Sequence, residues 1–481
     1  MAYKHGVYVS EVPTSIVPAV NTTAGLPVVF GTAPVHLATD RAAANRPVLC
    51  YSYAEAVQQL GFSKDWTKYT LCEVMYSQFA LYNRGPVVFV NVLDPKTHKK
   101  SVADKSVDIA DRVATLDAPV LLDTLKIKAS AVGSELVAGK DYEAAYDDDG
   151  ALVITLLDDG TASAASSLIL AYDELDPTAV DQDDIIGGIS VSDGSVKGLE
   201  CLNKVFPLTG LVPGIVLAPG WSHEPTVAAV MKAKAGNINS HFKAITLNDV
   251  PTESIKKYTD VKNWMNQNSY NDTAQVVCWP MVKMGDDIYH MSTHVLGVIA
   301  TVDSANGDIP YESPSNKSMQ INGCCLKDGT EVVLGPDEAG YLNGQGVVTA
   351  LNFIGGWKCW GNRTACYPSN TDPKDAFISI RRMFYWHAQT FIQTYWAKVD
   401  KPINKRLIQT VMDSENIRLN GLAAQGCILG GRVEFRDDEN PVTNLMDGII
   451  KFHTYITPCA PAREIENVLE YDPAYFETLF G

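Results

Sequence analysis

The sequence predicts a multidomain α/β (α+β) protein: an α/β body of alternating strands and helices that carries a β-rich inserted domain and extended N- and C-terminal arms. The chain has 481 residues, more than a single hydrophobic core usually holds, so several domains are expected. After residue 200, strand-length and helix-length apolar patterns alternate, which is typical of parallel βαβ units. Before it, short apolar runs separated by Asp-Gly turns indicate a β domain.

These patterns divide the chain into six segments. We place them at 1–21 (N-terminal extended arm), 22–95 (first part of the body), 96–200 (acidic inserted outer domain), 201–345 (second part of the body), 346–447 (C-terminal inner domain) and 448–481 (C-terminal β arm and tail).

The two parts of the body show the clearest periodicity. In the first part we expect a strand at 26–33, helices at 53–60 and 71–82, and a buried strand at 86–92. Gly61 is the expected stop of the first helix. In the second part we expect strands at 214–218, 242–247 and 274–279, and helices at 225–236, 253–267 and 290–302. The alternation predicts a parallel sheet with helices on its faces.

The inserted segment 96–200 holds most of the negative charge. It has 21 acidic and 9 basic residues, within a chain whose formal net charge is −17. Its apolar runs at 120–129, 152–157 and 168–172 alternate with turns at Asp149-Gly150 and Asp159-Gly160. Such an acidic excess is typical of a solvated face and argues against nucleic acid as the main partner.

The C-terminal inner domain contains an aromatic helix expected at 375–400. Its expected apolar face consists of side chains that recur every three to four positions: Phe377, Phe384, Ala388, Phe391, Tyr395 and Val399. A more polar helix is expected at 405–424. A basic group stands between the two helices and at the start of the second: Lys398, Lys401, Lys405 and Arg406.

Both ends of the chain favour extended backbone. Near the C-terminus, Ile450, Phe452, Thr454 and Ile456 alternate with polar or aromatic residues that include Tyr455, the period-2 pattern of a strand with one buried face. Near the N-terminus, the run Val7, Tyr8 and Val9 is followed by Pro13 and Pro18, which exclude a helix. A lone strand must join a sheet. The simplest alternative is that each end pairs within its own domain.

The composition indicates whether the chain is exported or inserted into a membrane, and whether its cysteines are reduced. No apolar run is long enough to span a bilayer, and the first residues lack the basic start and apolar core of an export signal, so we expect neither membrane insertion nor Sec-type export. The ten cysteines are spread through apolar segments without metal-binding spacing, so we expect buried structural thiols and a reducing compartment.

Several motifs resemble enzyme sites without completing them. Ser222 follows a strand as a hydrolase nucleophile does, but Glu224 stands where that turn needs glycine, so we expect a helix cap. His290 and His294 lie one helical turn apart, yet Met291 occupies the position of the glutamate in the zinc protease motif. No nucleotide-binding loop is complete. We therefore expect no catalytic residue, cofactor or metal.

In several short segments the chain resembles the tail sheath proteins of contractile phage tails and of R-type pyocin-like particles. The segments are Gly6-Val7-Tyr8 with Glu11, residues 23–34, residues 342–352, residues 360–364, and the C-terminal positions Arg381, Asn420, Gly448 and Ile465-Glu466. Together, in this order and at these separations, they are specific for that family. The resemblance that rests on them extends over about three quarters of the chain.

The resemblance implies a structural subunit that polymerises in six-fold rings as a helical sleeve and contracts by rigid-body rearrangement to drive an inner tube through a cell envelope. The implied partners are other copies of the chain, the inner tail tube protein, and baseplate and tail terminator proteins, with no nucleic acid and no membrane insertion. The implied location is a virion tail or a phage tail-like particle, assembled in the bacterial cytoplasm.

The resemblance also implies roles for particular residues. Val7, Tyr8 and Val9 at one end, and Ile450, Phe452, Tyr455 and Ile456 at the other, would pair with neighbouring subunits. The basic group Lys398, Lys401, Lys405 and Arg406 would contact the tube, unless it is simply solvated. Two other functions stay open at this point: an α/β enzyme with a β-rich accessory domain, and a non-contractile tube or shell protein.

Overall fold

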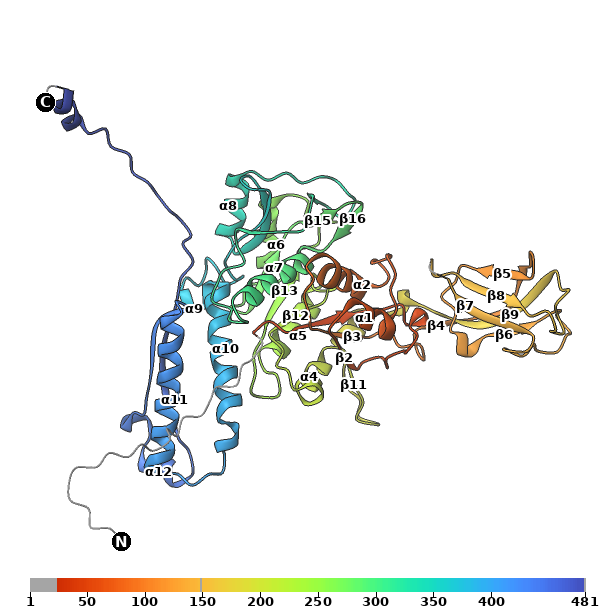
Figure 1. Cartoon of the computed structure of the whole chain (residues 1–481), viewed down its shortest axis with the longest axis horizontal. Coiled ribbons are helices and arrows are strands. Elements are labelled where there is room, and N and C mark those ends of the chain that lie inside the picture. The colour runs from red at the N-terminus through yellow and green to blue at the C-terminus, as the bar shows by residue number, and fades with distance from the viewer. Residues whose placement is uncertain (1–23, 148, 480–481) are drawn as a thin grey trace, which may run out of the picture.

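A nine-stranded mixed sheet forms the centre of the molecule (Figure 1). The computed structural model describes residues 24–147 and 149–479, so the N-terminal residues Val7, Tyr8 and Val9 lie outside the described part. Across the sheet the order is β17 (Lys317–Ser318), β20 (Trp357–Trp360), β19 (Val347–Asn352), β14 (Gln275–Cys278), β13 (Ile245–Asp249), β12 (Ile215–Leu217), β1 (Pro27–Gly31), β3 (Val87–Asn91) and β2 (Pro47–Cys50).

The middle of this sheet is parallel and buried on both faces. Neighbouring strands from β3 through β1, β12, β13 and β14 to β19 run parallel, and β2 and β20 pair antiparallel at the two sides. Every residue of β1, β3 and β13 is buried, as expected for strands covered by helices on both sides. The predicted α/β body is thereby confirmed.

Helices of the body pack against this sheet. They are α1 (Tyr53–Leu60), α2 (Thr70–Met75) with the π-helical turn η2 (Tyr76–Leu81), α3 (Gln182–Ile186), α4 (Leu202–Thr209), α5 (Pro225–Ala235), α6 (Val261–Gln267), α7 (Met291–Ala305) and α8 (Pro336–Gly344). The first has the predicted bounds: the Ser52 hydroxyl accepts a hydrogen bond from the Glu55 amide, and Gly61 ends it with a φ of 73°. The helix expected at 253–267 is shorter, because its first half is a loop and the 3₁₀ turn Tyr258–Asp260.

The inserted domain is a small β structure that projects from one side of the body (Figure 1). One three-stranded sheet consists of β4 (Lys99–Asp108), β9 (Ser167–Leu175) and β6 (Lys126–Lys128), and the other of β5 (Val113–Leu116), β8 (Leu152–Leu156) and β7 (Tyr142–Tyr146). Side chains such as Ile127, Ile154 and Leu170 form a separate hydrophobic core between them. The expectation of a β-rich insertion with its own interior is confirmed.

The insertion ends earlier than the predicted boundary at residue 200. Ile185 and Leu199 belong to the core of the body, and Gly198 donates a backbone hydrogen bond to the Asn45 side chain at 2.8 Å. The separate core of the insertion lies within 99–175. Residues 176–200 therefore belong to the body. The predicted boundary was wrong because the acidity of these residues resembles that of the insertion.

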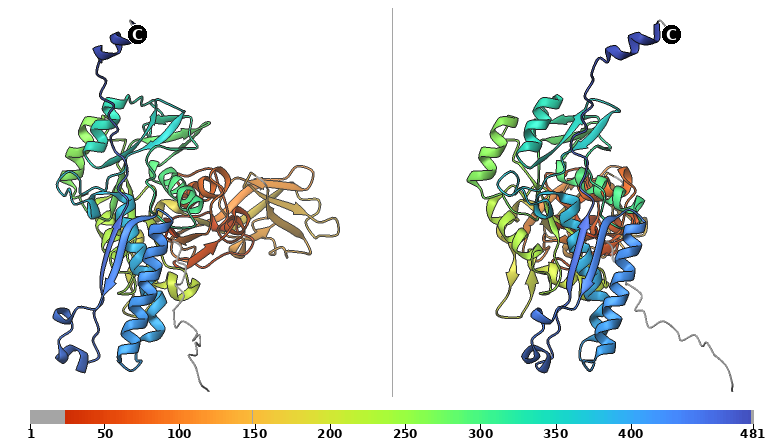
Figure 2. Two further views of the ribbon diagram at one scale, coloured as in Figure 1. Left: turned by 60° about the vertical axis from the view of Figure 1, so that its left-hand side comes forward. Right: turned by 90° about the vertical axis from the view of Figure 1, so that its left-hand side faces the viewer.

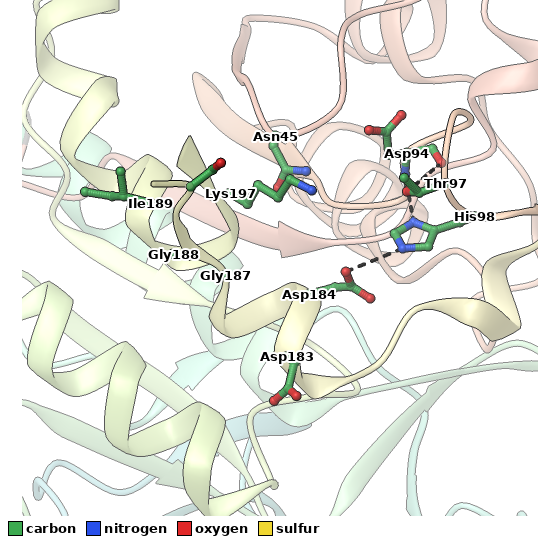
Figure 3. A pocket seen from close by; sticks show the side chains of 11 residues that line it. Asn45, Asp94, Thr97, His98, Asp183, Asp184, Gly187, Gly188, Ile189 and Lys197 are labelled. Atoms are coloured by element: carbon green, nitrogen blue, oxygen red, sulfur yellow. Dashed lines mark hydrogen bonds and ion pairs between the residues drawn. The ribbon is translucent and has the colours of Figure 1, made fainter. Parts of the chain in front are cut away.

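The chain enters and leaves the insertion at adjacent points (Figure 3). The Asp176 amide donates to the His98 carbonyl at 2.9 Å, and Lys100 forms an ion pair with Asp176 at 2.8 Å. His98 accepts a hydrogen bond at Nδ1 from the Asp94 amide, and its Nε2 lies 3.4 Å from Asp184. A pocket of about 300 Å³ lies at this seam. These hydrogen bonds and ion pairs hold the entering and leaving segments of the insertion together.

A long helical hairpin lies on the side opposite the insertion (Figures 1 and 2). After α9 (Pro373–Ala376) it consists of α10 (Ile378–Tyr395) and α11 (Lys405–Ala424). The strands β21 (Ile428–Glu434) and β22 (His453–Pro458) run beside α11 and are joined through α12 (Val442–Met446). Since β19 and β20 complete the central sheet, the C-terminal domain begins after them and not at residue 346.

The predicted apolar face of the aromatic helix is correct only in part: Phe377 and Tyr395 are buried, but other predicted members are not. Phe384 and Phe391 are only half-buried and Ala388 is exposed, whereas Arg382 and His387 are buried. Arg382 forms an ion pair with Asp303 of α7 (Nη1 to Oδ1 3.0 Å), in which both side chains are at most 5% exposed. Helix α10 is packed between neighbouring elements, so its polar side is buried as well. The ion pair with Asp303 offsets part of the free-energy cost of burying the Arg382 charge.

The first described residue, Ala24, is fixed at the base of this hairpin. Its carbonyl oxygen lies 3.5 Å from Nη2 of Arg382. Its side chain belongs to the small core that Met383, Leu419 and Val433 form between the helices and β21. The root of the N-terminal arm and the β21–β22 sheet therefore share one hydrophobic core.

Candidate functional site

The two-stranded sheet β21–β22 is the first candidate for an assembly surface. Its strands pair antiparallel over Ile428↔Pro458 to Glu434↔His453, with a bulge at Leu429. Among the described residues neither strand has a second neighbouring strand, so each has an unpaired edge. Such edges present backbone N–H and C=O groups that another strand can bond.

The side chains of this sheet divide into an anchored and an exposed set. Ile428 and Val433 are buried in the core shared with α10 and α11. On the exposed side Leu429 is 73% exposed, and the Arg432 guanidinium lies 3.9 Å from the centre of the Tyr455 ring. The sheet is therefore attached to the hairpin by one face. At the β21 edge the Asn416 side chain of α11 also bonds the Val433 amide (2.8 Å) and carbonyl oxygen (3.1 Å), whereas the β22 edge has no strand beside it among the described residues.

The predicted C-terminal arm residues lie partly in this sheet. Tyr455 and Ile456 are in β22, paired with Arg432 and Gly431 of the same chain, and Phe452 packs against the hairpin core. Ile450 precedes the strand and is half-buried. The strand also starts at His453, later than the alternation from Ile450 indicated. The structure thus brings these residues together within one chain; contacts of theirs with another chain stay a prediction.

The exposed tail beyond this strand lies within the predicted C-terminal β arm and tail, 448–481, but none of its residues was named as a pairing residue from the sequence. Residues 459–472 form neither helix nor strand, and the chain runs away from the hairpin to the 3₁₀ helix η9 (Pro473–Leu479) (Figures 1 and 2). Ile465, Leu469 and Tyr471 are 89%, 87% and 75% exposed. They stand at odd positions, while Glu464, Glu466 and Glu470 stand at even positions. This period-2 alternation, which is interrupted at Asn467 and Val468, is the signal that sequence reasoning missed.

The basic group lies at the other end of the hairpin from the tail (Figure 1). Lys401, Lys405 and Arg406 are exposed and Lys398 is half-buried. The structure shows no ion pair for these four residues among the described part of the chain. Two apolar side chains accompany them, Trp396 at 59% and Val399 at 62% exposure. The tip therefore offers positive charge beside apolar surface.

A crevice of about 550 Å³ lies at the carboxyl edge of the parallel strands, where an α/β enzyme would have its active site. Open α/β sheets bind ligands at this place. The Ser222 side chain is 1% exposed there, and its hydroxyl accepts the Asp249 amide at 3.0 Å. Asp249 in turn accepts the Ser292 amide at 2.9 Å and its hydroxyl at 2.5 Å. Ser222 is thus a buried structural group rather than an exposed nucleophile or a helix cap.

A second carboxylate holds the start of α7. Glu73 accepts the His290 amide at 2.6 Å and lies 2.8 Å from the His290 Nδ1 atom. Burial alone would lower the pKa of His290, but attraction to Glu73, the hydrogen bond with it and the nearby Asp249 raise it to about 9. A protonated histidine between carboxylates is suited to joining α2 and α7.

His290 and His294 do not share a site. His294 is fully buried, its Nδ1 lies 3.1 Å from the Tyr82 hydroxyl, and its ring packs edge-on against Tyr289. Burial lowers the pKa of His294 to about 3, so this ring is neutral. Within residues 24–147 and 149–479 no group of three His, Cys, Asp or Glu side chains is placed to hold a metal ion. In the same described ranges, none of the helices has the length and apolar character required to span a membrane.

Comparison with known proteins gives a consistent result. The chain is 27% identical over 496 aligned residues to the tail sheath protein of Burkholderia phage BcepMu, covering 100% of this chain and 99% of that protein. It is 23% identical to the tail sheath protein of Escherichia phage P2, over 73% of this chain and 84% of that protein. No protein-family model matches the chain.

The fold is shared with a contractile machine of known structure. A subunit of the sheath complex of an extracellular contractile injection system, PVC, in its contracted state superposes with a TM-score of 0.58, over 99% of both chains at 13% identity. The mixed α/β architecture is thus the same from end to end. The resemblance found in the sequence is confirmed, and the chain is a homologue of the tail sheath proteins of contractile phage tails.

Proposed function

We propose that this chain is the repeating subunit of a contractile tail sheath, a six-fold helical sleeve around an inner tube, and that its copies are joined by strands donated from one chain to the sheet of another. The full-length similarity to tail sheath proteins supports the sheath assignment. The observation that carries the joining mechanism is the coexistence, in one chain, of an unpaired strand-like tail and a sheet with unpaired edges.

The tail has the chemistry of a donor strand. Burying Ile465, Leu469 and Tyr471 against another copy would contribute roughly 1.5–3 kcal/mol for each side chain. Each main-chain hydrogen bond to the open edge of β21 or β22 would add about 0.5–1.5 kcal/mol. The sum is of the size needed to offset the roughly 4–15 kcal/mol that association costs in lost freedom.

The N-terminal arm is proposed as the second donor. Val7, Tyr8 and Val9 have the β-branched and aromatic composition of a strand, and the first described residue after the arm, Ala24, lies in the core beneath the β21–β22 sheet. A two-stranded sheet has two edges, so one could receive an N-terminal strand and the other a C-terminal strand; a strand added at the β21 edge would displace the Asn416 side chain from Val433. Contraction then requires only that rigid subunits rotate while these main-chain links persist.

Substitutions on the two faces of the tail test this mechanism. The triple variant Ile465→Asp, Leu469→Asp, Tyr471→Asp removes the odd-numbered apolar face, and Val468→Asp is the matched control on the even-numbered face. Both should unfold at the temperature of the wild type, because the changed side chains are exposed. Electron microscopy should show sleeves for the control and only separate subunits for the triple variant. Normal sleeves from the triple variant would contradict strand donation by the tail.

We also propose that the hairpin tip faces the inner tube. The unpaired cations Lys401, Lys405 and Arg406 would then meet acidic groups on the tube surface, with Trp396 and Val399 beside them. Exposed charge pairs of this kind mainly speed the association of two surfaces and fix their relative position. The double variant Lys401→Glu, Arg406→Glu should form sleeves that fail to enclose tubes, whereas retained, salt-insensitive tube binding would exclude this contact.

A further inference from the structure

Two cysteines stand opposite each other where the tail leaves the β21–β22 sheet. The last pair of the ladder is Ile428↔Pro458, so the same register places Cys427 opposite Cys459. The Cys459 sulfur lies 3.6 Å from the Gly426 carbonyl oxygen, the residue before Cys427. Directly opposed residues of an antiparallel pair have Cβ atoms about 4.5–5.5 Å apart, close to the roughly 3.5–4.5 Å of a disulfide. The pair lies at an open end of the ladder, where a small closure is allowed.

Cys459 is also the accessible cysteine of the chain. All ten cysteines lie in the described ranges, and the other nine are buried. Cys427 is 4% exposed, and burial together with the adjacent Cys459 thiol raises its pKa. An external oxidant therefore meets Cys459 first and finds a second thiol next to it.

We propose that Cys427 and Cys459 form a reversible disulfide that fastens the root of the C-terminal tail to the β21–β22 sheet. A low-molecular-weight disulfide such as oxidised glutathione supplies the oxidising equivalents. The Cys459 thiolate attacks one glutathione sulfur, the S–S bond breaks, and one glutathione thiolate leaves. The Cys427 thiolate then attacks the Cys459 sulfur and releases the second glutathione. Two cysteine protons end on two glutathione molecules, and two electrons reduce the oxidant.

The position of this bond gives it a mechanical role, a step that rests on the proposed function. The bond closes the segment that contains β21, α12 and β22 at the point where the tail begins. In a sleeve held by donated tails, a pull on the tail is carried into β22 and then across its hydrogen bonds with β21. With the disulfide present, the same pull passes through a covalent bond.

The chemistry is tested on the isolated, folded chain. Exposure to oxidised glutathione should lower the mass of the intact chain by about 2 Da, and subsequent alkylation, digestion and mass spectrometry should yield one cross-linked peptide pair joining residues 427 and 459. Cys427→Ser and Cys459→Ser should each abolish the cross-link, and the buried control Cys359→Ser should retain it. A stable glutathione adduct on Cys459 with Cys427 still free in the folded chain would overturn the proposal.

The mechanical role is tested on assembled sleeves. Oxidised wild-type sleeves should withstand a higher urea concentration than reduced ones before releasing subunits, and Cys427→Ser sleeves should show no such difference. If the cross-link forms and this difference is absent, the disulfide does not fasten the tail. If the oxidised chain carries the cross-link but no variant, including the wild type, forms sleeves, the sheath function fails while the cysteine chemistry stands.

Discussion

The α/β body and the C-terminal tail differ in how far their apolar side chains are buried, and their polar groups hydrogen-bonded, within one chain. In the body the largest side chains, Trp279, Phe30 and Phe89 among them, are at most 1% exposed, and buried carboxylates such as Asp249 have their hydrogen bonds within the chain. In the tail Ile465 and Leu469 are almost fully exposed, and the backbone from 459 to 472 joins no sheet. The body therefore buries its apolar side chains within one chain, whereas the tail leaves its own exposed.

The insertion resembles the body in this respect. It has its own core and a hydrogen-bonded base, so its attachment to the body is local. Self-sufficient parts should therefore respond to substitution through stability, and incomplete parts through assembly. Three experiments can break or sharpen this distinction.

The largest effect on stability is expected at the buried ion pair between α7 and α10. Asp303→Ala leaves Arg382 charged and buried without its partner, which should lower the free energy of unfolding by about 3–5 kcal/mol. The control is the exposed pair Arg432–Glu434, where Glu434→Ala should cost less than about 1 kcal/mol. Urea unfolding of the unassembled chain measures both. Equal losses would mean that burial does not distinguish the two pairs.

The ion pair of His290 predicts a stability loss at alkaline pH. Its pKa is about 9 in the folded chain against an ordinary value of 6.5, so its contribution, on the order of 3 kcal/mol, is complete below pH 6.5 and disappears as the pH rises through 9. The difference in unfolding free energy between wild type and His290→Gln should therefore close over this interval. Urea unfolding at several pH values follows it.

His294 provides the opposite control for that pH series. Its pKa is lowered to about 3, so the wild type should lose stability as the pH falls from 6.5 toward 3, when the unfolded chain binds a proton that the folded chain excludes. His294→Gln should reduce this acid dependence, to which His36 and His387, whose pKa values are also lowered by burial, contribute as well, and should keep the alkaline one. An alkaline limb unchanged by His290→Gln would show that Glu73 does not hold a charged histidine.

The smallest effect is expected from removal of the insertion. Replacing residues 99–175 by a short Gly/Ser linker removes Leu121 and Leu175 from the body core but keeps the rest of it, including Ile185 and Leu199. Calorimetry should show the unfolding temperature of the body within a few degrees of the wild type. Electron microscopy should show sleeves with a thinner outer wall. A folded chain that cannot assemble would place the insertion in the lattice.

The sequence was sufficient to predict an element where the segment itself carries a clear apolar pattern or residues that mark its ends. The strands at 26–33 and 86–92 were correctly predicted because they are continuous apolar runs between turns, and the helix 53–60 because Ser52 and Gly61 mark its ends. Strand β4 was missed because Lys99, Lys100 and most of its other side chains are solvated, which leaves no apolar alternation to detect.

The candidate site was harder to predict because its contacts are not encoded locally. The alternation around Phe452 and Ile456 was correctly identified as a strand, yet the identity of its partner, β21, depends on the chain folding back through α12. On α10 the burial of Arg382 depends on Asp303 in α7. A periodicity can show that a face is covered, but not which element covers it.

The attachment of Ala24 has a mechanical consequence for the proposed sleeve. Ala24, the first described residue after the N-terminal arm, and the sheet proposed to receive a neighbour's strands belong to one small core with Met383 and Val433. If both links form as proposed, tension that enters a subunit through one link would leave through the other without crossing the nine-stranded sheet. The links and C-terminal sheets of connected subunits would then form one continuous load path. The α/β body and its insertion would lie beside this path and could rotate as rigid bodies while the subunits stay connected.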